Sequence, residues 1–231
     1  PTINGISVSL YETIKIEKGD LLEFGKLMDG CRAYISFAGG IDTENELGSR
    51  ATYTYAEIGG IHGTVLKKGD CIPISEVSQC VIKRVPEEYQ LQYASILTVR
   101  VIEGPEVDRF EKKSLDDFYK TEFVISNQSN RMGYKLSGKK IKLTQPFEML
   151  SSGIVNGTIQ IPQDGNPIIL LADGQTTGGY PRIANIISVD IPILGQQKPG
   201  DKIRFKDIEV NEAQSLLFNK QNRYSVLFSG C

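Results

Sequence analysis

Several features that mark common protein classes are missing from this sequence. No run of about eighteen apolar residues occurs, so no segment is predicted to form a membrane-spanning helix. The formal net charge is only -2, which provides no electrostatic attraction toward nucleic acid or an anionic membrane surface. We therefore expect neither nucleic acid nor a membrane among the partners.

Cysteine and histidine are scarce as well. The four cysteines, Cys31, Cys71, Cys80 and Cys231, contain no C-x-x-C pair, and this irregular spacing argues against a zinc site and against a disulfide framework. His62 is the single histidine, so a multi-histidine metal centre within this chain is excluded. We expect no bound metal, free thiols that act as small buried hydrophobes, and a cytoplasmic location.

The composition is that of an ordinary globular protein. Hydrophobic residues make up 40% of the 231 residues and charged residues make up 23%, as in soluble folded domains. This length allows one large domain or two small ones, each with its own core. The chain begins at Pro1 and soon enters a strand-like alternation of apolar residues, and we expect an N-terminal portion of the fold to be missing.

Short strand-like runs separated by glycine turns dominate the sequence. Three turns share one pattern, Lys18-Gly19-Asp20, Lys68-Gly69-Asp70 and Pro199-Gly200-Asp201, in which glycine supplies the positive φ of a tight turn. Their presence in both halves suggests two related barrels. The predicted strands are Thr13–Ile16, Ala33–Ala38, Ser95–Ile102, Glu122–Ser126, Ile168–Ala172, Ile186–Asp190 and Tyr224–Phe228.

Only two segments have the spacing of helices. Ser114 is a suitable N-cap for a helix over Leu115–Tyr119, and Val210–Asn219 places its apolar and small residues on one face. A proline and several charges at Pro86–Tyr93 indicate a linker. The sequence therefore predicts an all-β protein of two barrel lobes with two short helices. The first lobe is expected over residues 1–90 and the second over residues 91–231.

Three pairs of sequence blocks have more unusual residue choices than a β-barrel scaffold requires. They are Gly30–Ile41 with Leu47–Tyr53, Arg100–Pro105 with Ser129–Tyr134, and Gln160–Gly165 with Ala172–Pro181. In order and spacing they resemble the signature blocks of the C-type subunits of 5-oxoprolinase, a family also named allophanate hydrolase subunit 2 or KipA-like. The resemblance runs from about Gly5 to the final helix. The same module forms part of the carboxyltransferase region of urea carboxylase.

The resemblance implies both a fold and a function. The implied fold has two cyclophilin-like β-barrel lobes. The implied function is that of one component of an ATP-dependent 5-oxoprolinase complex, which hydrolyses 5-oxo-L-proline to L-glutamate. The expected partners are a B-type 5-oxoprolinase protein, similar to allophanate hydrolase subunit 1, and an A-type 5-oxoprolinase protein. Because this chain has no P-loop, no G-x-S-x-G elbow and no H-E-x-x-H, we expect ATP to bind with the partner proteins.

Two other functions are compatible with the resemblance. One is the carboxyltransferase-type domain of a biotin-dependent urea carboxylase, with biotin carried by another chain because no A-M-K-M motif is present. The other is a non-enzymatic KipA-like antagonist of a histidine-kinase inhibitor. The chain departs from the family pattern at Glu106, where glutamine is frequent, and at Gly174, where arginine is frequent. The family's N-terminal motifs are absent.

The block Asp173-Gly-Gln-Thr-Thr-Gly-Gly-Tyr-Pro181 is the main candidate for a binding site. An apolar strand leads into this loop, which holds a carboxylate, an amide, two hydroxyls and a phenol, and its glycines let a ligand approach the backbone closely. The alternative is a loop whose Asp and Thr side chains satisfy backbone donors. The substrate-binding residues predicted here are Asp173, Gln175, Thr176 and Tyr180.

Three further residues are predicted to join them. Arg50 and Arg131 lie in runs of small polar residues, where a guanidinium can hold a carboxylate or carbamoyl oxygen with two parallel bonds. A structural ion pair is the alternative for each arginine. Gln160 is an amide in an otherwise apolar strand and needs a partner there. We expect these side chains to converge around a small amide substrate, whereas the catalytic residues are not identified by the sequence.

Overall fold

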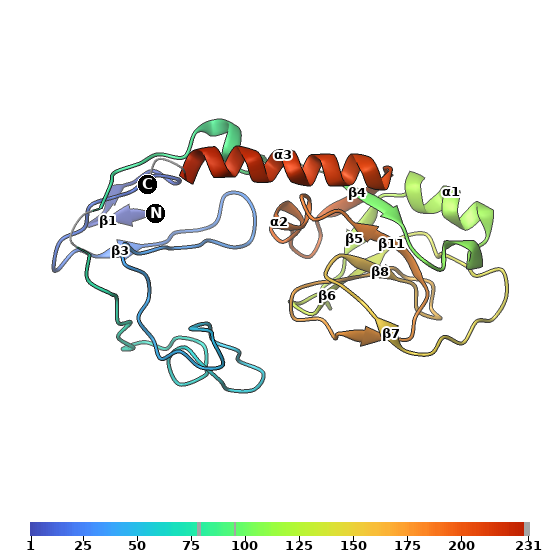
Figure 1. Ribbon diagram of the computed structural model, residues 1–231, viewed down its shortest axis with the longest axis horizontal. Coiled ribbons are helices and arrows are strands. Elements are labelled where there is room, and N and C mark those ends of the chain that lie inside the picture. Colours follow the sequence, from blue (N-terminus) through green and yellow to red (C-terminus); the bar gives the residue numbers. More distant parts are fainter. Residues whose placement is uncertain (78–79, 95, 229–231) are drawn as a thin grey trace. The chain divides into compact units, whose positions relative to one another are not determined.

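The chain divides into two compact units, which are visible in the computed structural model (Figure 1). The structure describes residues 1–77, 80–94 and 96–228, with side chains up to residue 225. Unit 1 comprises residues 1–25 and 33–89, and unit 2 comprises residues 26–32 together with residues 90–231. The short segment 26–32 therefore packs with unit 2, although its neighbours in sequence belong to unit 1.

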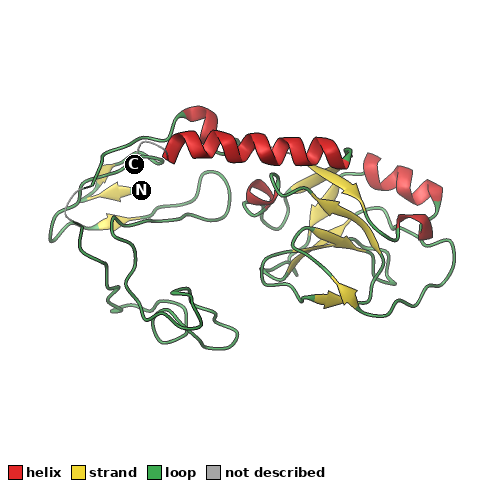
Figure 2. Cartoon of the chain, viewed as in Figure 1, coloured by secondary structure: helices red, strands yellow, loops and turns green. Residues whose placement is uncertain are grey.

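Unit 2 is built around a closed β-barrel, so the predicted all-β fold is confirmed (Figure 2). In order around the barrel the strands are β11 (Arg182–Ile186), β4 (Ile96–Glu103), β12 (Lys202–Asp207), β5 (Phe123–Ile125), β6 (Gly133–Ser137), β9 (Ile168–Leu170) and β8 (Thr158–Gln160). Pairing of β8 with β11 closes the ring. Strands β4 and β12 run parallel, and the other barrel pairs are antiparallel.

A separate small ribbon accompanies the barrel. Strand β7 (Ser152–Gly153) pairs antiparallel with β10 (Thr177–Gly178). Strand β10 lies inside the loop that the sequence singles out as a binding site, so this pairing fixes the far end of that loop.

The hydrophobic core of the described residues lies entirely in unit 2. Leu97, Val99 and Val101 of β4 are buried, while Thr98 between them is exposed. This period of two is expected for a strand with one apolar face. Every buried hydrophobic side chain among the described residues falls between Leu97 and Ile208.

Three α-helices are described, one more than the sequence predicts. They are α1 (Lys112–Lys120), α2 (Ile191–Leu194) and α3 (Val210–Phe228), and two 3-10 turns lie at η1 (Glu87–Tyr89) and η2 (Val107–Arg109). Helix α1 buries Phe118, whose ring stacks on that of Phe205 at a centroid distance of 4.5 Å. No helix in the described part of the chain is long and apolar enough to cross a bilayer.

The predicted cap of α1 is wrong. Ser114 lies within the helix, where its Oγ accepts a hydrogen bond from the backbone N–H of Lys142 at 3.0 Å. Glu111 occupies the N-cap position and makes no side-chain cap hydrogen bond. The helix begins two residues before Ser114, and the serine hydroxyl binds a distant segment that spacing along the helix does not reveal.

Four predicted strands are also wrong in whole or in part. Residues Thr13–Ile16 and Ala33–Ala38 belong to no strand. The predicted strand Ile186–Asp190 overlaps a strand only at its first residue, because β11 ends at Ile186 and α2 begins at Ile191. The predicted strand Tyr224–Phe228 is the end of α3. Neither glycine nor proline interrupts the chain between Asn219 and Phe228, so the helix continues through aromatic and β-branched residues that favour a strand only in isolation.

The three glycine turns are confirmed, and they are alike in detail. Gly19, Gly69 and Gly200 have φ of 100°, 96° and 92°. In each turn the following aspartate accepts a hydrogen bond from the backbone N–H three residues earlier, at 2.7, 2.7 and 2.9 Å. The carboxylate thus closes a turn that the positive φ of glycine makes possible.

Unit 1 consists mainly of loops, drawn green in Figure 2. Its strands are β1 (Thr2–Ile3), β2 (Ile6–Ser7) and β3 (Leu22–Glu23), which form an antiparallel sheet in the order β2-β1-β3. Its two cysteines, Cys71 and Cys80, are free and exposed rather than buried as expected. Cys231 lies outside the described residues.

Candidate functional site

The pairing of β6 with β9 brings two of the predicted site residues together. Gly133 pairs with Leu170, so the turn before β6 lies beside the loop after β9. Arg131 Nε donates to Asp173 Oδ2 at 2.6 Å, and Arg131 Nη2 donates to Asp173 Oδ1 at 3.0 Å. This two-bond geometry is the strong form of an arginine–carboxylate contact. The Arg131 guanidinium lowers the pKa of the Asp173 carboxyl below its usual range.

Gln160 is a buried residue of β8 rather than a residue of an open surface. Its side chain is buried in β8, and its Nε2 donates to the backbone carbonyl of Tyr180 at 3.4 Å. Gly178 lies against the same amide, because a Cβ atom at that position would come within 2.5 Å of Gln160 Nε2. In this arrangement Gln160 holds the segment 178–180 by its backbone, and the partner required by a buried amide is provided.

The remaining loop residues are exposed. Gln175, Thr176 and Tyr180 have exposed side chains, and the carbonyl of Thr176 accepts a hydrogen bond from the backbone N–H of Ile154 at 3.0 Å. The loop is therefore fixed by its backbone at several points while its side chains face outward. A loop of this kind can present an amide, a hydroxyl and a phenol to a ligand without first being ordered.

Arg50, the seventh predicted residue, belongs to unit 1. Its Nη1 binds the Asp42 carboxylate and also contacts the carbonyl of Ile41 at 3.3 Å. The six other predicted residues belong to unit 2. Within unit 2 the structure brings Arg131 to Asp173 and Gln160 to the backbone of Tyr180, and the substrate-binding role of all seven stays a prediction.

A second ion pair, between Arg182 and Glu106, is not predicted from the sequence. Arg182 directly follows the candidate loop along the chain. Arg182 Nε donates to Glu106 Oε2 at 2.7 Å, and Arg182 Nη1 donates to the carbonyl of Gly153 at 3.0 Å. Both charged side chains are largely buried. Hydrogen bonding to Arg182 lowers the pKa of Glu106, and the same pair raises the pKa of Arg182. The departure from the family pattern at Glu106 is the one sequence signal that points to this pair.

Arg182 also lines the larger of two pockets described in unit 2. This pocket has a volume of about 680 Å³, and its wall is mainly apolar. Strand ends supply Ile102, Thr158 and Asn185, and the first turns of α3 supply Ala213 and Leu217. Thr158 Oγ1 lies 2.9 Å from Asn185 Oδ1, so two of the polar groups in the wall satisfy one another.

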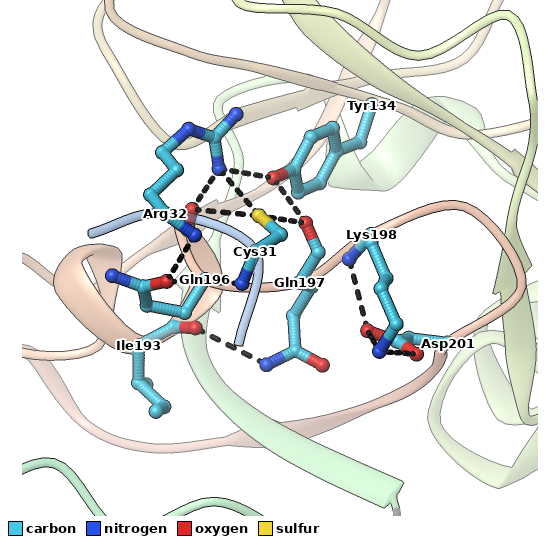
Figure 3. A network of polar contacts seen from close by, with 9 residues as sticks. Cys31, Arg32, Tyr134, Ile193, Gln196, Gln197, Lys198 and Asp201 are labelled. Atoms are coloured by element: carbon cyan, nitrogen blue, oxygen red, sulfur yellow. Dashed lines mark hydrogen bonds and ion pairs between the residues drawn. The ribbon is translucent and has the colours of Figure 1, made fainter. Parts of the chain in front are cut away.

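Segment 26–32 is anchored to unit 2 by a network of polar contacts (Figure 3). The side-chain oxygen of Gln196 accepts hydrogen bonds from the backbone N–H groups of Cys31 at 3.2 Å and Arg32 at 3.0 Å. Arg32 Nη1 lies 3.0 Å from Cys31 Sγ and 3.3 Å from the hydroxyl of Tyr134. The Tyr134 hydroxyl donates to the carbonyl of Gln197 at 2.8 Å.

This anchor satisfies its own polar groups, which favours a structural role. Burial raises the pKa of the Tyr134 hydroxyl, and the bond from Arg32 only partly opposes that effect. The adjoining smaller pocket, of about 350 Å³, is lined by Met28, Asp29, Gly30, Tyr93, Ala94, Gln196, Gln197, Lys198 and Asp201. The two N–H groups that could otherwise bind a ligand oxygen already bind Gln196. No group of three His, Cys, Asp or Glu side chains is placed to hold a metal ion in the part of the chain that the structure describes.

Comparisons with known proteins agree with the resemblance that the sequence blocks indicate. The carboxyltransferase domain family, subdomains A and B, matches residues 1–207. The C-type subunit of 5-oxoprolinase from Escherichia coli is 37% identical over 93% of this chain, and that from Haemophilus influenzae is 34% identical over 90%. The chain spans 68% and 66% of these two proteins, about two thirds of each.

Urea-metabolising relatives are similar over the same region. Urea amidolyase of Saccharomyces cerevisiae is 30% identical over 93% of this chain and 13% of its own length. The crystal structure of Kluyveromyces lactis urea carboxylase matches 97% of this chain and 22% of its own chain, with a TM-score of 0.87 and 28% identity. From the residues matched and the identities over most of its length, this chain belongs to the carboxyltransferase domain family of subdomains A and B, and its relatives there include the C-type subunits of 5-oxoprolinase.

Proposed function

We propose that this chain is the C-type subunit of an ATP-dependent 5-oxoprolinase complex that hydrolyses 5-oxo-L-proline to L-glutamate. One observation carries the proposal. The chain is 37% and 34% identical to two C-type subunits of 5-oxoprolinase, but 30% and 31% identical to two urea amidolyases, over 90–93% of its length in each case. The higher identity over an equal span favours the cyclic amide over urea as substrate.

The chemistry of the proposed reaction requires help from other chains. Opening a five-membered lactam requires an activated amide oxygen, which phosphoryl transfer from ATP would provide, followed by attack of water. This chain has no phosphate-binding P-loop. In the proposal, the A-type and B-type partner proteins therefore hold ATP, and this chain forms part of the pocket for the substrate or its activated intermediate.

The loop after β9 is the part of unit 2 best suited to such a pocket. The substrate carries a carboxylate, which Arg131 can bind with two parallel hydrogen bonds. Asp173 holds Nε and Nη2 of that guanidinium, so a substrate carboxylate would displace or share this partner. The loop that follows Asp173 also carries three exposed side chains, those of Gln175, Thr176 and Tyr180. In the proposal they supply donors and acceptors for the ring amide.

The direct test is turnover by the assembled complex. This protein would be co-expressed with its A-type and B-type partner proteins, and ADP and glutamate would be measured with and without 5-oxo-L-proline. We expect ADP and glutamate to form in equal amounts, and only when all components are present. A complex that assembles but forms no glutamate from 5-oxo-L-proline would refute the proposal.

A second function has one observation in its favour. The likeness to the K. lactis urea carboxylase structure, with a TM-score of 0.87 over 97% of the chain, also suits a biotin-dependent carboxyltransferase. The biotin would then be carried by another chain. Urea-dependent bicarbonate consumption by the same complex, together with a biotinylated partner on purification, would support this second function over the first.

A further inference from the structure

Three side chains form a row across the outer face of the barrel of unit 2. Ile102 of β4 pairs with Asn185 of β11, and Asn185 pairs with Thr158 of β8. Directly paired residues of antiparallel strands project to the same face. Because Val101 of β4 is buried in the core, its neighbour Ile102 and the rest of the row lie on the opposite face. The row lines the larger pocket of unit 2, and we call it the floor of that pocket.

Helix α3 supplies the facing wall of the pocket. Ala213 and Leu217 line it; they lie about one turn apart on the same side of the helix, and both are half-buried. The helix is held on unit 2 beyond the pocket, where Lys220 Nζ donates to the carbonyl of Val189 at 3.1 Å. The small side chain of Ala213 leaves space above the floor that a larger residue would fill.

The amide of Asn185 has a fixed orientation in the floor. The backbone N–H of Val155 donates to Thr158 Oγ1 at 3.2 Å, and the single hydrogen of that hydroxyl is then donated to Asn185 Oδ1, 2.9 Å away. Asn185 Nδ2 is therefore directed away from Thr158. Among the described residues none accepts a hydrogen bond from Nδ2, and this nitrogen is not enclosed by protein atoms. Its N–H groups are open to the pocket that Asn185 lines.

The pocket offers no unpaired charge to a ligand. Arg182 is the one charged residue among the described residues that line it, and Glu106 accepts hydrogen bonds from Nε and Nη2 of the guanidinium. Nη1 of Arg182 donates to the carbonyl of Gly153. An ionised ligand would leave water for a mainly apolar site without gaining a partner for its charge, which is unfavourable. The lining therefore favours a neutral ligand.

We propose that this pocket binds a neutral, mainly apolar small molecule that carries one acceptor oxygen, such as a ketone or ester carbonyl, and that Asn185 Nδ2 donates to that oxygen. The apolar part of the ligand lies between Ile102 and the α3 side chains. The pocket volume of about 680 Å³ falls within the range of about 300–1,000 Å³ for small-molecule sites. Because Thr158 already orients the amide, binding does not have to order it.

This site is separate from the one proposed for 5-oxo-L-proline. That substrate carries a carboxylate, and the pocket under α3 has no unpaired cation to receive it. The proposal therefore goes beyond the proposed reaction and holds or fails independently of it.

The test is binding of small probes to the full chain, followed through its backbone amides by two-dimensional proton–nitrogen NMR. Acetophenone is a neutral ring with a carbonyl, toluene is a similar ring without an acceptor, and benzoate is a related anion. We expect acetophenone and toluene to bind with dissociation constants in the millimolar range or below and to shift the amides of Ile102, Asn185 and Ala213. Benzoate and 5-oxo-L-proline should leave these amides unchanged at the same concentrations.

Asn185→Leu isolates the proposed hydrogen bond. Leucine has a similar size but no donor, so acetophenone should bind about fivefold more weakly to the variant. Toluene should bind the variant and the parent within about twofold, because comparing the two probes cancels a change in pocket shape. Asn185→Asp provides the same test if Asn185→Leu does not fold, since it removes the donor but keeps the oxygen that Thr158 binds. Asn156→Asp places the same charge elsewhere in the lining and should weaken acetophenone less.

A matched pair of substitutions on α3 locates the site. Ala213→Phe should weaken the binding of both probes about tenfold or more, because the added ring occupies the space above the floor. Ser215→Phe should leave both affinities unchanged, since Ser215 is exposed and projects from the opposite side of α3.

Four results would overturn the proposal. The first is the absence of shifts in the pocket amides of the parent protein when acetophenone is added. The second is an equal loss of acetophenone and toluene binding in Asn185→Leu, and the third is an equal effect of Ala213→Phe and Ser215→Phe. The fourth is displacement of acetophenone by benzoate or 5-oxo-L-proline, because the pocket would then take an anion.

Discussion

Mutating the Arg131–Asp173 ion pair would show whether the loop after β9 binds substrate or has a purely structural role. The Arg131 side chain is 71% exposed and that of Asp173 is 29% exposed. Exposed ion pairs contribute about 0.2–1 kcal/mol to stability, because water screens the charges and the side chains lose conformational freedom on pairing. We therefore expect Arg131→Ala to lower the melting temperature by no more than about 4 °C.

The expected effect of Arg131→Ala on activity is much larger. Two parallel hydrogen bonds from a guanidinium to a substrate carboxylate are worth on the order of 2 kcal/mol or more when that carboxylate is held in a pocket. A loss of about 2 kcal/mol corresponds to roughly a thirtyfold fall in kcat/KM. The assay is 5-oxo-L-proline-dependent ADP formation by the assembled complex, run on the same preparation as the melting measurement.

Asp173→Asn is the matched control for this experiment. It removes the carboxylate that competes for Arg131 but keeps the size of the side chain, so a binding role predicts that KM for 5-oxo-L-proline stays equal or falls. If the pair only fixes the loop, both variants should lose stability and activity to the same extent. A destabilised Arg131→Ala complex with normal specific activity would refute the binding role.

Three further predictions concern the described contacts of unit 2. Arg182→Met should cost about 3 kcal/mol in urea denaturation, because it leaves the largely buried Glu106 carboxylate without its partner. Since Arg182 lowers the pKa of Glu106, the pair stabilises the fold at neutral pH, and this contribution is lost as the pH falls below about 4. Arg182→Met should therefore show less acid dependence than the parent, and an unchanged pH profile would count against the pair. Phe118→Ala should cost about 3–5 kcal/mol in the same assay, because it removes a fully buried ring that stacks on Phe205; a cost below about 1 kcal/mol would contradict the packing. Gly178→Ala should lower the melting temperature, since its Cβ would lie 2.5 Å from Gln160 Nε2, and adding Gln160→Ala should restore part of the loss; no rescue would exclude this contact as the cause.

Much of the barrel of unit 2 could be predicted from local sequence. The run around Val99 alternates with a period of two, those around Val124 and Ile169 are short continuous apolar stretches rich in β-branched residues, and each contains a strand in the structure. The predictions fail where a neighbour decides the outcome. Ala33–Ala38 has the composition of a strand but belongs to none of the described ladders, and a strand without a partner leaves its backbone groups unsatisfied.

The candidate site was predictable as a loop but not as a set of contacts. Its glycines and polar residues are visible in the sequence at 173–181. The contact between Arg131 and Asp173 depends instead on the pairing of Gly133 with Leu170, and no local pattern contains that register. Gln160 shows the same limit, because the sequence indicates that its amide needs a partner but not that the partner is a backbone carbonyl of the candidate loop.

A physical criterion helps to distinguish a ligand-binding role from a structural role for four arginines in or beside the signature blocks. Each binds a carboxylate with its guanidinium: Arg50 with Asp42, Arg100 with Asp190, Arg131 with Asp173 and Arg182 with Glu106. Ligand binding at such a pair means exchanging the protein's carboxylate for that of the substrate. This exchange costs little where the pair is exposed, because water can receive the displaced carboxylate. It costs several kcal/mol where the pair is buried, because the displaced charge is left without a partner. Arg100 and Arg182 belong to the more buried pairs, with side chains 32% and 16% exposed, whereas those of Arg50 and Arg131 are 47% and 71% exposed. By this criterion the exchange is less costly at Arg50 and Arg131 than at Arg100 and Arg182. Arg131 has the more exposed guanidinium of the two, whereas its partner Asp173 is 29% exposed and Asp42, the partner of Arg50, is 50% exposed.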